Sequence, residues 1–414
     1  MWTGPGSLGP RLAHGLRFTE MAGSSVAEVQ RAAIWRNVRF LRVVGQLVFA
    51  VVVVWAFREL YLNLEYGVRR VGTDLSFDFL QTRSGIPIKE GIAYDPNQSY
   101  LRAYVVAVAN TVRVAGIGVV LAMLLGLVIG VARLSPNWLV RKIAQVYVEV
   151  IRNTPVLIQI IFWYFGILFA LPLIEGGLSL GGVAFLSQRG AAIPWPHIGE
   201  GAGAWGLWLL GGLVLAGAVW WWRTKVNERT GRPHHRVLWS LPVLVTVAAV
   251  GYAIVGDAVR LDVPEVAGRL YRGGFQLSGE FTGILVGLVI YTAAFIAEIV
   301  RGSILAVDKG QKEAAQALGL SPAQQLRFVV LPQAFRIAVP PLNSQFLNLT
   351  KNSSLAVAVA YPELSSVSST MINQAGRPFQ ITMLVMATYL TMSLTISFVM
   401  NVVNRVVTRK GEGR

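Results

Sequence analysis

The sequence predicts an all-α polytopic membrane protein with about eight transmembrane helices. Of its 414 residues, 54% are hydrophobic and only 14% are charged, whereas a soluble domain carries roughly 25% charged residues. Several apolar runs reach about 18 residues or more, which is the length that crosses roughly 30 Å of hydrocarbon. These runs are continuous, while a β-barrel would show alternating segments of about ten residues.

The apolar runs define eight predicted spans. They cover residues 43–62, 102–132, 150–173, 204–222, 237–256, 280–300, 335–358 and 380–404. Arginine and lysine gather in alternate segments between the spans, and the positive-inside rule then places both termini in the cytoplasm. Because the formal charge of +16 follows this topology, it does not indicate nucleic-acid binding. The chain has no cysteine, which excludes disulfides and thiolate metal sites.

Residues 1–42 form a predicted cytoplasmic segment ahead of the first span. Ser25 and Glu28 have capping-box spacing before several arginines, a pattern typical of a basic interfacial helix. A simple topogenic flank is the alternative. No small-residue cleavage site follows the run at 43–62, so we interpret it as a retained span and not as a signal peptide. The biological start is either Met1 or Met21.

The cytoplasmic loop at 303–334 predicts a short helix with well-defined ends. Asp308 is a preferred N-cap residue, and Gln311 follows it at capping-box spacing. The alanines after it are strong helix formers. Gly319 then stands where a left-handed residue ends a helix.

A second short helix is predicted directly after that glycine. Ser321 and Pro322 are suited to its N-cap and first position, and the pair Leu331–Pro332 is expected to end it before the seventh span. A helix with an alanine-rich face fits the close approach of a partner surface. An ordinary loop that returns the chain to the membrane is the alternative interpretation.

The loop resembles the EAA loop of ABC importer permeases through "EAAQALGL" and the later "LPQAF". The longer stretches "AAFIAEIVRGSILAVDKGQKEAAQALGL", "LPQAFRIAVPPLNSQFLNLTKNSSLA" and "VEVIRNTPVLIQIIFWYFG" resemble the polar amino-acid uptake family of type I ABC importers. That family includes the histidine, glutamine and general L-amino-acid permeases. The likeness runs from about residue 102 to 405 and is interrupted at roughly 174–275.

The resemblance implies a domain organisation. A five-helix type I importer core would consist of the second, third, sixth, seventh and eighth spans, within an ABC transmembrane domain at 102–405. Residues 174–275 would be an insertion that carries two additional spans. Residues 43–101 would add a first span and a periplasmic loop, and 406–414 would form a cytoplasmic tail.

The resemblance also implies a function. The chain would be the permease subunit of an ATP-driven importer that moves L-amino acids, polar or broad-range, from a periplasmic binding protein across the bacterial inner membrane. Its partners would be a related permease subunit, in a heterodimer, and a cytoplasmic ABC ATPase dimer. The sequence has no Walker A motif, so ATP and Mg belong to that ATPase and this chain is expected to be non-catalytic, with no cofactor or metal of its own. The residues that would couple it to the ATPase are Gln311, Lys312, Glu313, Ala314, Ala315, Gln316, Leu318 and Gly319.

Polar residues inside the spans are candidates for the translocation path, because charged groups in hydrocarbon are unfavourable. The candidates are Lys351, Asn352, Ser353, Asn153, Thr154, Gln159, Arg113 and Glu298. Each also has a structural interpretation. Lys351 either meets a substrate carboxylate or pairs within the bundle, and Arg113 is expected in a salt bridge or carbonyl contact. Glu298 is expected to pair with Arg301, and Asn153 or Thr154 to cap a helix.

An ion-gradient-driven secondary amino-acid transporter is the alternative function. Such transporters show inverted repeats and broken helices near the midplane of the membrane. The sequence shows no convincing internal symmetry, and this alternative leaves the EAA-like loop unexplained. Which amino acids are carried, and whether the permease is a homodimer or heterodimer, stay open at this level.

Overall fold

The computed structural model describes residues 38–70, 76–231 and 235–412. The chain divides into two units at Leu75. In the first, the single described helix is α1 (Val38–Arg70), which contains the predicted span 43–62 and extends it at both ends. The predicted interfacial helix near Ser25 lies outside the described residues.

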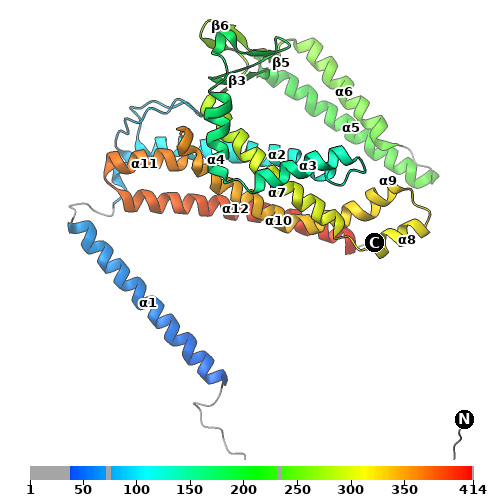
Figure 1. The fold of residues 1–414 in the computed structure, drawn as a ribbon. Helices are drawn as coiled ribbons and strands as arrows, with labels where there is room; N and C mark the ends of the chain where they lie inside the picture. The colour runs from blue at the N-terminus through cyan, green and yellow to red at the C-terminus, as the bar shows by residue number, and fades with distance from the viewer. Residues whose placement is uncertain (1–37, 71–75, 232–234, 413–414) are drawn as a thin grey trace, which may run out of the picture. The chain divides into compact units, whose positions relative to one another are not determined.

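The second unit, from Ser76 onward, is mainly helical (Figure 1). Its helices are α2 (Tyr100–Ala132), α3 (Trp138–Arg152), α4 (Val156–Ile161), α5 (Ala202–Thr230), α6 (Arg236–Val255), α7 (Gly279–Leu305), α8 (Lys309–Ala317), α9 (Pro322–Gln325), α10 (Leu331–Asn352), α11 (Leu364–Ala375) and α12 (Pro378–Glu412). Within the described ranges, six helices of the chain are long and apolar enough to cross a membrane, or eight when two bent helix pairs each count as one span. The predicted class of polytopic helical membrane protein is confirmed.

Short strands, which the sequence did not predict, occupy the insertion. They are β1 (Leu178–Leu180), β2 (Ala184–Ser187), β3 (Gly190–Ile193), β4 (Trp195–Ile198), β5 (Val259–Asp262), β6 (Glu265–Ala267), β7 (Leu270–Arg272) and β8 (Phe275–Ser278). With three or four residues each, they are too short to show a clear alternation of apolar and polar side chains.

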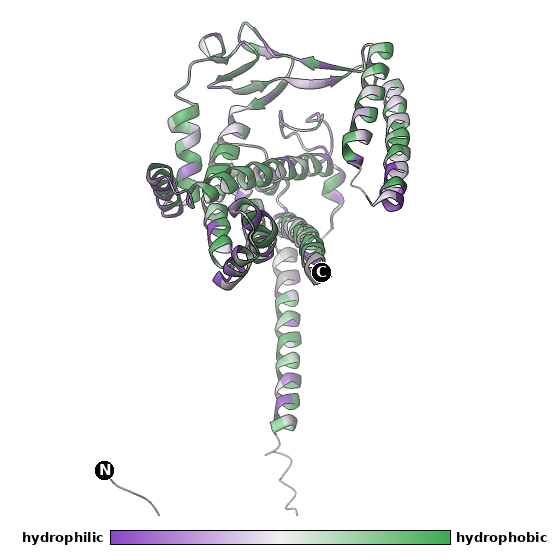
Figure 2. Cartoon of the chain, turned by 90° about the vertical axis from the view of Figure 1, so that its right-hand side faces the viewer, coloured by the Kyte–Doolittle hydropathy of each residue, from purple (hydrophilic) through white to green (hydrophobic). Residues whose placement is uncertain are grey.

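The strand pairing closes the insertion onto itself. An antiparallel sheet has the order β1-β2-β3-β8, and β4 pairs separately with β5. Gly190 of β3 lies opposite Ser278 of β8, so the two ends of the insertion meet. The helical hairpin α5–α6 therefore leaves the strands between β4 and β5 (Figure 1). Figure 2 shows hydrophobic residues along most of this hairpin and hydrophilic residues where α5 passes into α6.

The third predicted span, 150–173, is wrong as a single helix. Helix α3 ends at Arg152, and the segment from Val156 to Leu168 turns away from it by 108°. The cause is Pro155, which lacks a backbone N–H and disfavours helical geometry at Thr154. Beyond α4, the chain continues as a π-helix over Phe162–Leu168.

The seventh predicted span, 335–358, also ends differently from the prediction. Helix α10 passes into a 3₁₀ segment, Ser353–Val359, and the chain then turns by 56° into α11, which was not predicted. The fully buried Glu363 is the N-cap of α11: its Oε1 accepts from the Ser366 N–H at 2.8 Å. Its Oε2 accepts from the Tyr389 hydroxyl of α12 at 3.1 Å, which fixes the turn against the core.

Close packing of α2 on α7 forms the centre of the helical core. The buried side chains of this core come from α2, α4, α7, α10 and the segment after α10, and they are Val114, Ile160, Ile284, Leu288, Ile296, Leu342, Leu349 and Tyr361, among others. Gly126 and Gly130 let the backbones approach: a Cβ at Gly126 would lie 2.6 Å from the Ile296 side chain and 2.9 Å from the Ala293 carbonyl oxygen. Small residues at helix contacts are typical of membrane bundles, where van der Waals packing drives association.

The variant Gly126→Ala is therefore expected to destabilise the α2–α7 contact by about 1–3 kcal/mol, because the added methyl group overpacks the site. Gly116→Ala on the same helix is the matched control, since a Cβ at Gly116 has no atom within 4 Å. Thermal unfolding of the two purified variants, followed by tryptophan fluorescence, measures the difference. Equal melting temperatures would show that the helices adjust to the extra methyl group without loss.

Candidate functional site

Helix α8 has the N-terminus that the sequence predicts. Asp308 adopts extended backbone angles and its Oδ1 accepts from the Gly310 N–H at 2.6 Å. The capping-box role of Gln311 is not observed. Its side-chain Oε1 instead accepts from Nε2 of Gln333 at 3.3 Å, which ties α8 to the start of α10.

The C-terminus of α8 is a Schellman motif centred on Gly319. The Gly319 N–H donates to the Gln316 carbonyl at 2.9 Å, and the Leu320 N–H donates to the Ala315 carbonyl at 3.2 Å. Gly319 has φ +72°, the left-handed conformation that this motif requires. The predicted glycine stop is confirmed.

The second short helix starts as predicted but does not end as predicted. Ser321 and Gln324 form a reciprocal capping box, with Pro322 at the first helical position. Helix α9 then continues through a π-helical segment, Leu326–Val330, directly into α10, so Leu331–Pro332 begins a helix instead of ending one. Proline is tolerated there because the π-helical turn before it changes the hydrogen-bond pattern.

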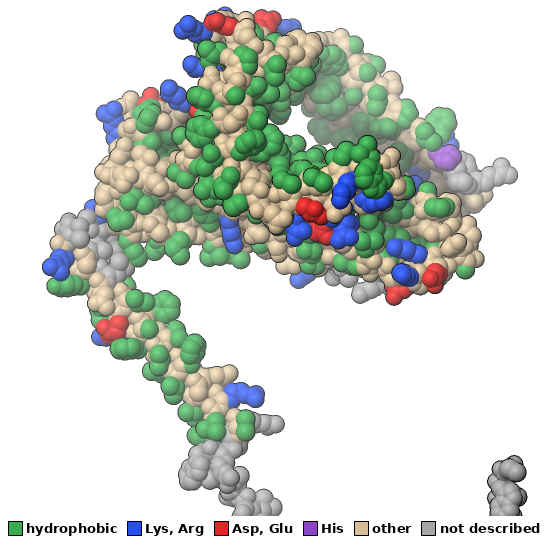
Figure 3. Space-filling model, in the orientation of Figure 1, with side chains coloured by type: hydrophobic (Ala, Val, Ile, Leu, Met, Phe, Trp, Pro, Cys, Tyr) green, Lys and Arg blue, Asp and Glu red, His purple; other side chains and the backbone are tan. Residues whose placement is uncertain are grey.

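Most of the α8 surface is exposed. Ala315 is 3% exposed, whereas the neighbouring Leu318 is 81% exposed. Gln311, Glu313, Ala314, Gln316 and Ala317 are also exposed, and Lys312 is half-buried. Figure 3 shows acidic and basic side chains gathered around this end of the helical core, next to α8 and α9. Leu318 is therefore an exposed apolar side chain at the end of a helix that is capped at both ends.

Three of the candidate path residues stabilise the break between α3 and α4. Asn153 Nδ2 donates to the Glu149 carbonyl at 2.7 Å, and Thr154 Oγ1 donates to the Val150 carbonyl at 2.9 Å. Gln159 is buried and its Nε2 donates to the Thr154 carbonyl at 2.9 Å. These contacts add side-chain hydrogen bonds to carbonyl groups at and just after the end of α3. The predicted capping of a helix start by Asn153 or Thr154 is not observed, because Pro155 is the N-cap of α4, and both side chains bond to the end of α3 instead.

The residues Lys351, Asn352 and Ser353 lie at the C-terminal end of α10. Lys351 is exposed, and among the described residues its side chain has no polar partner. Ser353 is fully buried, and its hydroxyl donates to the Thr350 carbonyl at 2.6 Å. Within the described ranges, Lys351 does not show the internal pairing that the sequence left open, and its contact with a substrate stays a prediction.

Glu298 belongs to a charge cluster that joins three helices. Its Oε1 accepts from Nη2 of Arg301, one turn later on α7, at 2.5 Å, as predicted. Its Oε2 contacts Nη1 of Arg133, at the end of α2. The charges of Glu149 and Arg152 on α3 also act on Arg133. Glu298 thus connects helices at the end of α7 that leads into α8.

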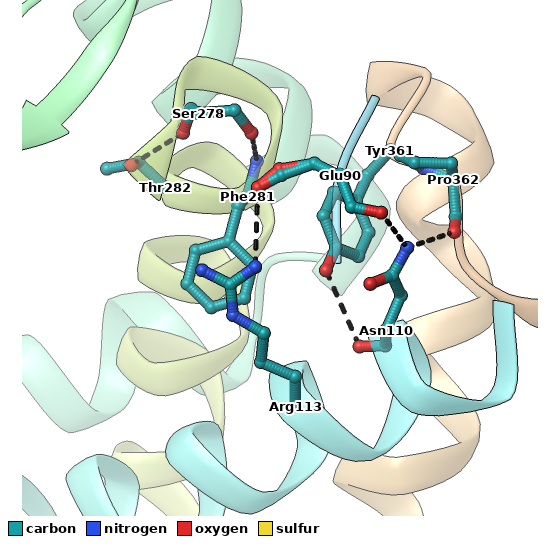
Figure 4. Close-up of polar contacts among 8 residues, drawn as sticks. All are labelled: Glu90, Asn110, Arg113, Ser278, Phe281, Thr282, Tyr361 and Pro362. Carbon is teal, nitrogen blue, oxygen red and sulfur yellow. Dashed lines mark hydrogen bonds and ion pairs between the residues drawn. The ribbon is translucent and has the colours of Figure 1, made fainter. Parts of the chain in front are cut away.

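Arg113 has the ion pair that the sequence anticipated, with a partner that the sequence did not identify. Nη1 of Arg113 lies 3.5 Å from Oε1 of Glu90, in the segment between α1 and α2. The guanidinium also stacks over the ring of Phe275, with its carbon 5.0 Å from the ring centroid. It stacks over the ring of Phe281 as well, at 4.4 Å (Figure 4). Burial raises the pKa of the Glu90 carboxyl above its ordinary value, and the Arg113 charge opposes that rise.

The structure brings further residues to Arg113 that sequence reasoning missed. Asn110, one turn earlier on α2, is fully buried and its Nδ2 donates to the Glu90 and Pro362 carbonyls at 3.2 Å and 2.9 Å (Figure 4). The available signal was the charge of Arg113 itself, because an arginine within an apolar span requires a partner. The neighbouring loop "IPIKEG" at 86–91 offers Glu90 as its acid.

Known proteins share both the domain and most of the chain. Residues 118–411 match the family described as "Binding-protein-dependent transport system inner membrane component". The General L-amino acid transport system permease protein AapQ of Rhizobium johnstonii is 41% identical over 341 residues, which cover 82% of this chain and 85% of that protein. The putative amino-acid ABC transporter permease protein YhdX of Escherichia coli is 38% identical, over 91% of this chain and 93% of that protein.

A third relative supports the same grouping. The glutamate/glutamine/aspartate/asparagine transport system permease protein BztB of Rhodobacter capsulatus is 39% identical, over 89% of this chain and 93% of that protein. These matches include the insertion and not the helical core alone. The chain therefore belongs to the binding-protein-dependent transport system inner membrane components, as a type I ABC importer permease of the polar amino-acid group.

Proposed function

We propose that this chain is the permease subunit of an ATP-driven importer that carries L-amino acids across the bacterial inner membrane, with both termini in the cytoplasm. The printed names of relatives that share most of the chain support an amino-acid substrate. The distribution of basic residues supports the orientation. A periplasmic binding protein delivers the amino acid, and a related permease subunit completes the membrane part.

The observation that carries the proposal is the geometry of α8. The helix is nine residues long, both of its ends are fixed by capping contacts, and its outer face is exposed with Leu318 at 81%. Such a rigid, exposed element is suited to receive force from a partner and to pass it to α7 and α10, between which it lies in the chain. The sequence has no phosphate-binding loop, so the partner is an ATPase that holds ATP and Mg.

The α8 surface therefore inserts into a cleft of that ATPase. Glu313 and Gln316 supply polar contacts at the interface, and Leu318 supplies the apolar contact. ATP-driven closure of the ATPase moves α8 as a rigid unit, and the membrane helices alternate between inward and outward access.

Reconstitution into liposomes tests the proposal. We expect uptake of labelled L-glutamine into liposomes that contain the chain, its co-purifying permease, ATPase and binding protein to require ATP. Omission of the ATPase should stop uptake, while ionophores that dissipate proton and sodium gradients should leave it unchanged. Uptake without the ATPase that the ionophores abolish would instead establish a secondary transporter.

A further inference from the structure

A polar cavity of about 710 Å³ lies between the segment before α2, the helix α2 itself and the strands β7 and β8. A volume of roughly 300–1,000 Å³ is usual for a small-molecule site. Its lining residues come from distant parts of the sequence and include the charged or polar Lys89, Glu90, Asn110, Arg113, Arg189, Tyr271, Gln276 and Ser278. A second cavity, of about 740 Å³, shares Lys89, Glu90, Arg189 and Ser278 with the first. The two cavities together leave space for a ligand with a side chain.

The Arg113 guanidinium lines this cavity and makes few hydrogen bonds within the described part of the chain. Among the described residues its only polar partner is Glu90, at 3.5 Å, which is the outer limit of a hydrogen bond. The rings of Phe275 and of Phe281, the second of which is seen in Figure 4, pack against the guanidinium. An oriented guanidinium with free N–H groups matches the two oxygens of a carboxylate.

Asn110 positions Glu90 beside this cavity. Both of its Nδ2 bonds go to backbone carbonyls, which leaves Oδ1 buried with no hydrogen-bond partner among the described residues. Gly91, at φ +97°, lies directly against this oxygen, and a Cβ at that position would collide with it. Gly91 therefore covers this oxygen, and Asn110 holds the Glu90 segment in place without meeting a ligand.

Glu90 supplies a negative charge to the same cavity. Its side chain is 14% exposed, and the carboxyl lies near Ser278. A carboxylate and a guanidinium that meet only at 3.5 Å therefore line one cavity. A ligand that satisfies both groups carries an ammonium and a carboxylate close together.

We propose that this cavity binds the zwitterionic backbone of an α-amino acid, with Arg113 holding the carboxylate and Glu90, which Asn110 positions, accepting from the ammonium. The proposal rests on the proposed function for the substrate class. Recognition through the two charged groups common to all α-amino acids leaves the side chain in the adjoining cavity. The site therefore predicts a broad specificity for amino acids. On binding, the ligand would separate Arg113 from Glu90 and form one ion pair with each of them.

Three probe molecules of similar shape test which charged groups the cavity binds. L-Glutamine carries both groups, L-glutaminamide lacks the carboxylate and glutaramate lacks the ammonium. Binding to the purified full chain in lipid nanodiscs is measured by calorimetry. We expect L-glutamine to bind at least about tenfold more tightly than either analogue, because a hydrogen bond to a charged group is worth roughly a factor of ten or more.

Variants separate a binding role from a structural one. Arg113→Met should weaken L-glutamine binding at least about tenfold, and Arg113→Lys should restore part of it. Arg102→Met is the matched control, since Arg102 lies on the same helix and donates to the Ala93 carbonyl outside the cavity. Glu90→Gln should weaken L-glutamine binding and strengthen glutaramate binding, because Arg113 loses its competing carboxylate.

Opposite shifts for the two probes cannot arise from partial misfolding, which weakens both. Equal binding of all three probes, or equal affinity of Arg113→Met and the control, would overturn the site. ATP-dependent uptake by liposomes that contain the unaltered chain is measured in parallel. If uptake is normal while the variants bind like the control, the cavity assignment fails and the transport function stands; if the unaltered chain shows no ATP-dependent uptake, the transport function itself fails.

Discussion

A valine at Gly319 is expected to uncouple ATP hydrolysis from uptake while the chain still inserts into the membrane. Gly319 has φ +72°, and a Cβ at this position would meet no atom within 4 Å. The substitution therefore acts through backbone strain and not through a collision. Left-handed geometry costs a residue with a Cβ roughly 1–2 kcal/mol, and a β-branched one more.

Strain of that size matters at α8 because it acts on one of the two capped ends that make the helix rigid. The Schellman bonds at Gly319 and Leu320 fix its end, and Ala315 is its one buried side chain. A penalty of about 1–2 kcal/mol shifts the population of the native helix end roughly five- to thirty-fold. The proposed lever would then bend instead of transmitting the movement of the ATPase.

The measurement compares ATP hydrolysis and L-glutamine uptake in the same liposomes. Gly319→Asn is the matched control, since asparagine tolerates left-handed geometry far better than valine. We expect the asparagine variant to retain most of the uptake per ATP hydrolysed. In the valine variant, uptake per ATP hydrolysed should fall at least about five-fold. Normal coupling in an inserted valine variant would reject the role of this helix end.

The ends of α8 could be predicted because they depend on neighbouring residues. Asp308, Gly319 and the Ser321–Pro322 pair each act within a few positions along the chain, and the structure places all of them as expected. Gln311 was misjudged for a non-local reason. Its amide contacts Gln333, more than twenty residues away, and no local pattern contains that contact.

The cavity beside Arg113 shows the limit of prediction from this sequence. Its residues come from the segment before α2, from α2, from the turn before β3 and from β8, and they meet because β3 pairs with β8. Strands of three or four residues leave too weak a pattern to predict that pairing. A charge inside an apolar run indicated that a partner exists, but only the fold identifies Glu90 and Asn110.

The bend in the third predicted span could be predicted only in part from the sequence. Pro155 predicted a disturbed helix, yet hydropathy alone continued the span across it. At the 108° turn, Asn153, Thr154 and Gln159 donate side-chain hydrogen bonds to backbone carbonyls on the α3 side of the break. Polar residues next to a proline inside an apolar run are therefore equally consistent with a broken helix and with a substrate path.

Removal of the charge at Glu298 is expected to destabilise the junction of α2, α3 and α7. In the native chain two glutamates, Glu149 and Glu298, act with Arg133, Arg152 and Arg301. Glu298→Gln leaves three arginines with one glutamate. Breaking a buried ion pair costs about 3–5 kcal/mol. The side chains of Glu298 and Arg301 are 27% and 32% exposed, so water screens part of their attraction. We therefore expect Glu298→Gln to lower the free energy of unfolding by about 2 kcal/mol.

Unfolding of the purified chain by SDS titration measures this difference. The conservative variant Glu175→Gln is the control. The side chains of Glu175 and Arg269 are 64% and 89% exposed, so their ion pair should contribute less than about 1 kcal/mol to the free energy of unfolding. The double variant Glu298→Gln with Arg301→Gln should recover part of the lost stability, because it removes one of the arginines left unbalanced. A double variant at least as unstable as the single one would mean that the packing of Glu298, and not its charge, holds the three helices together.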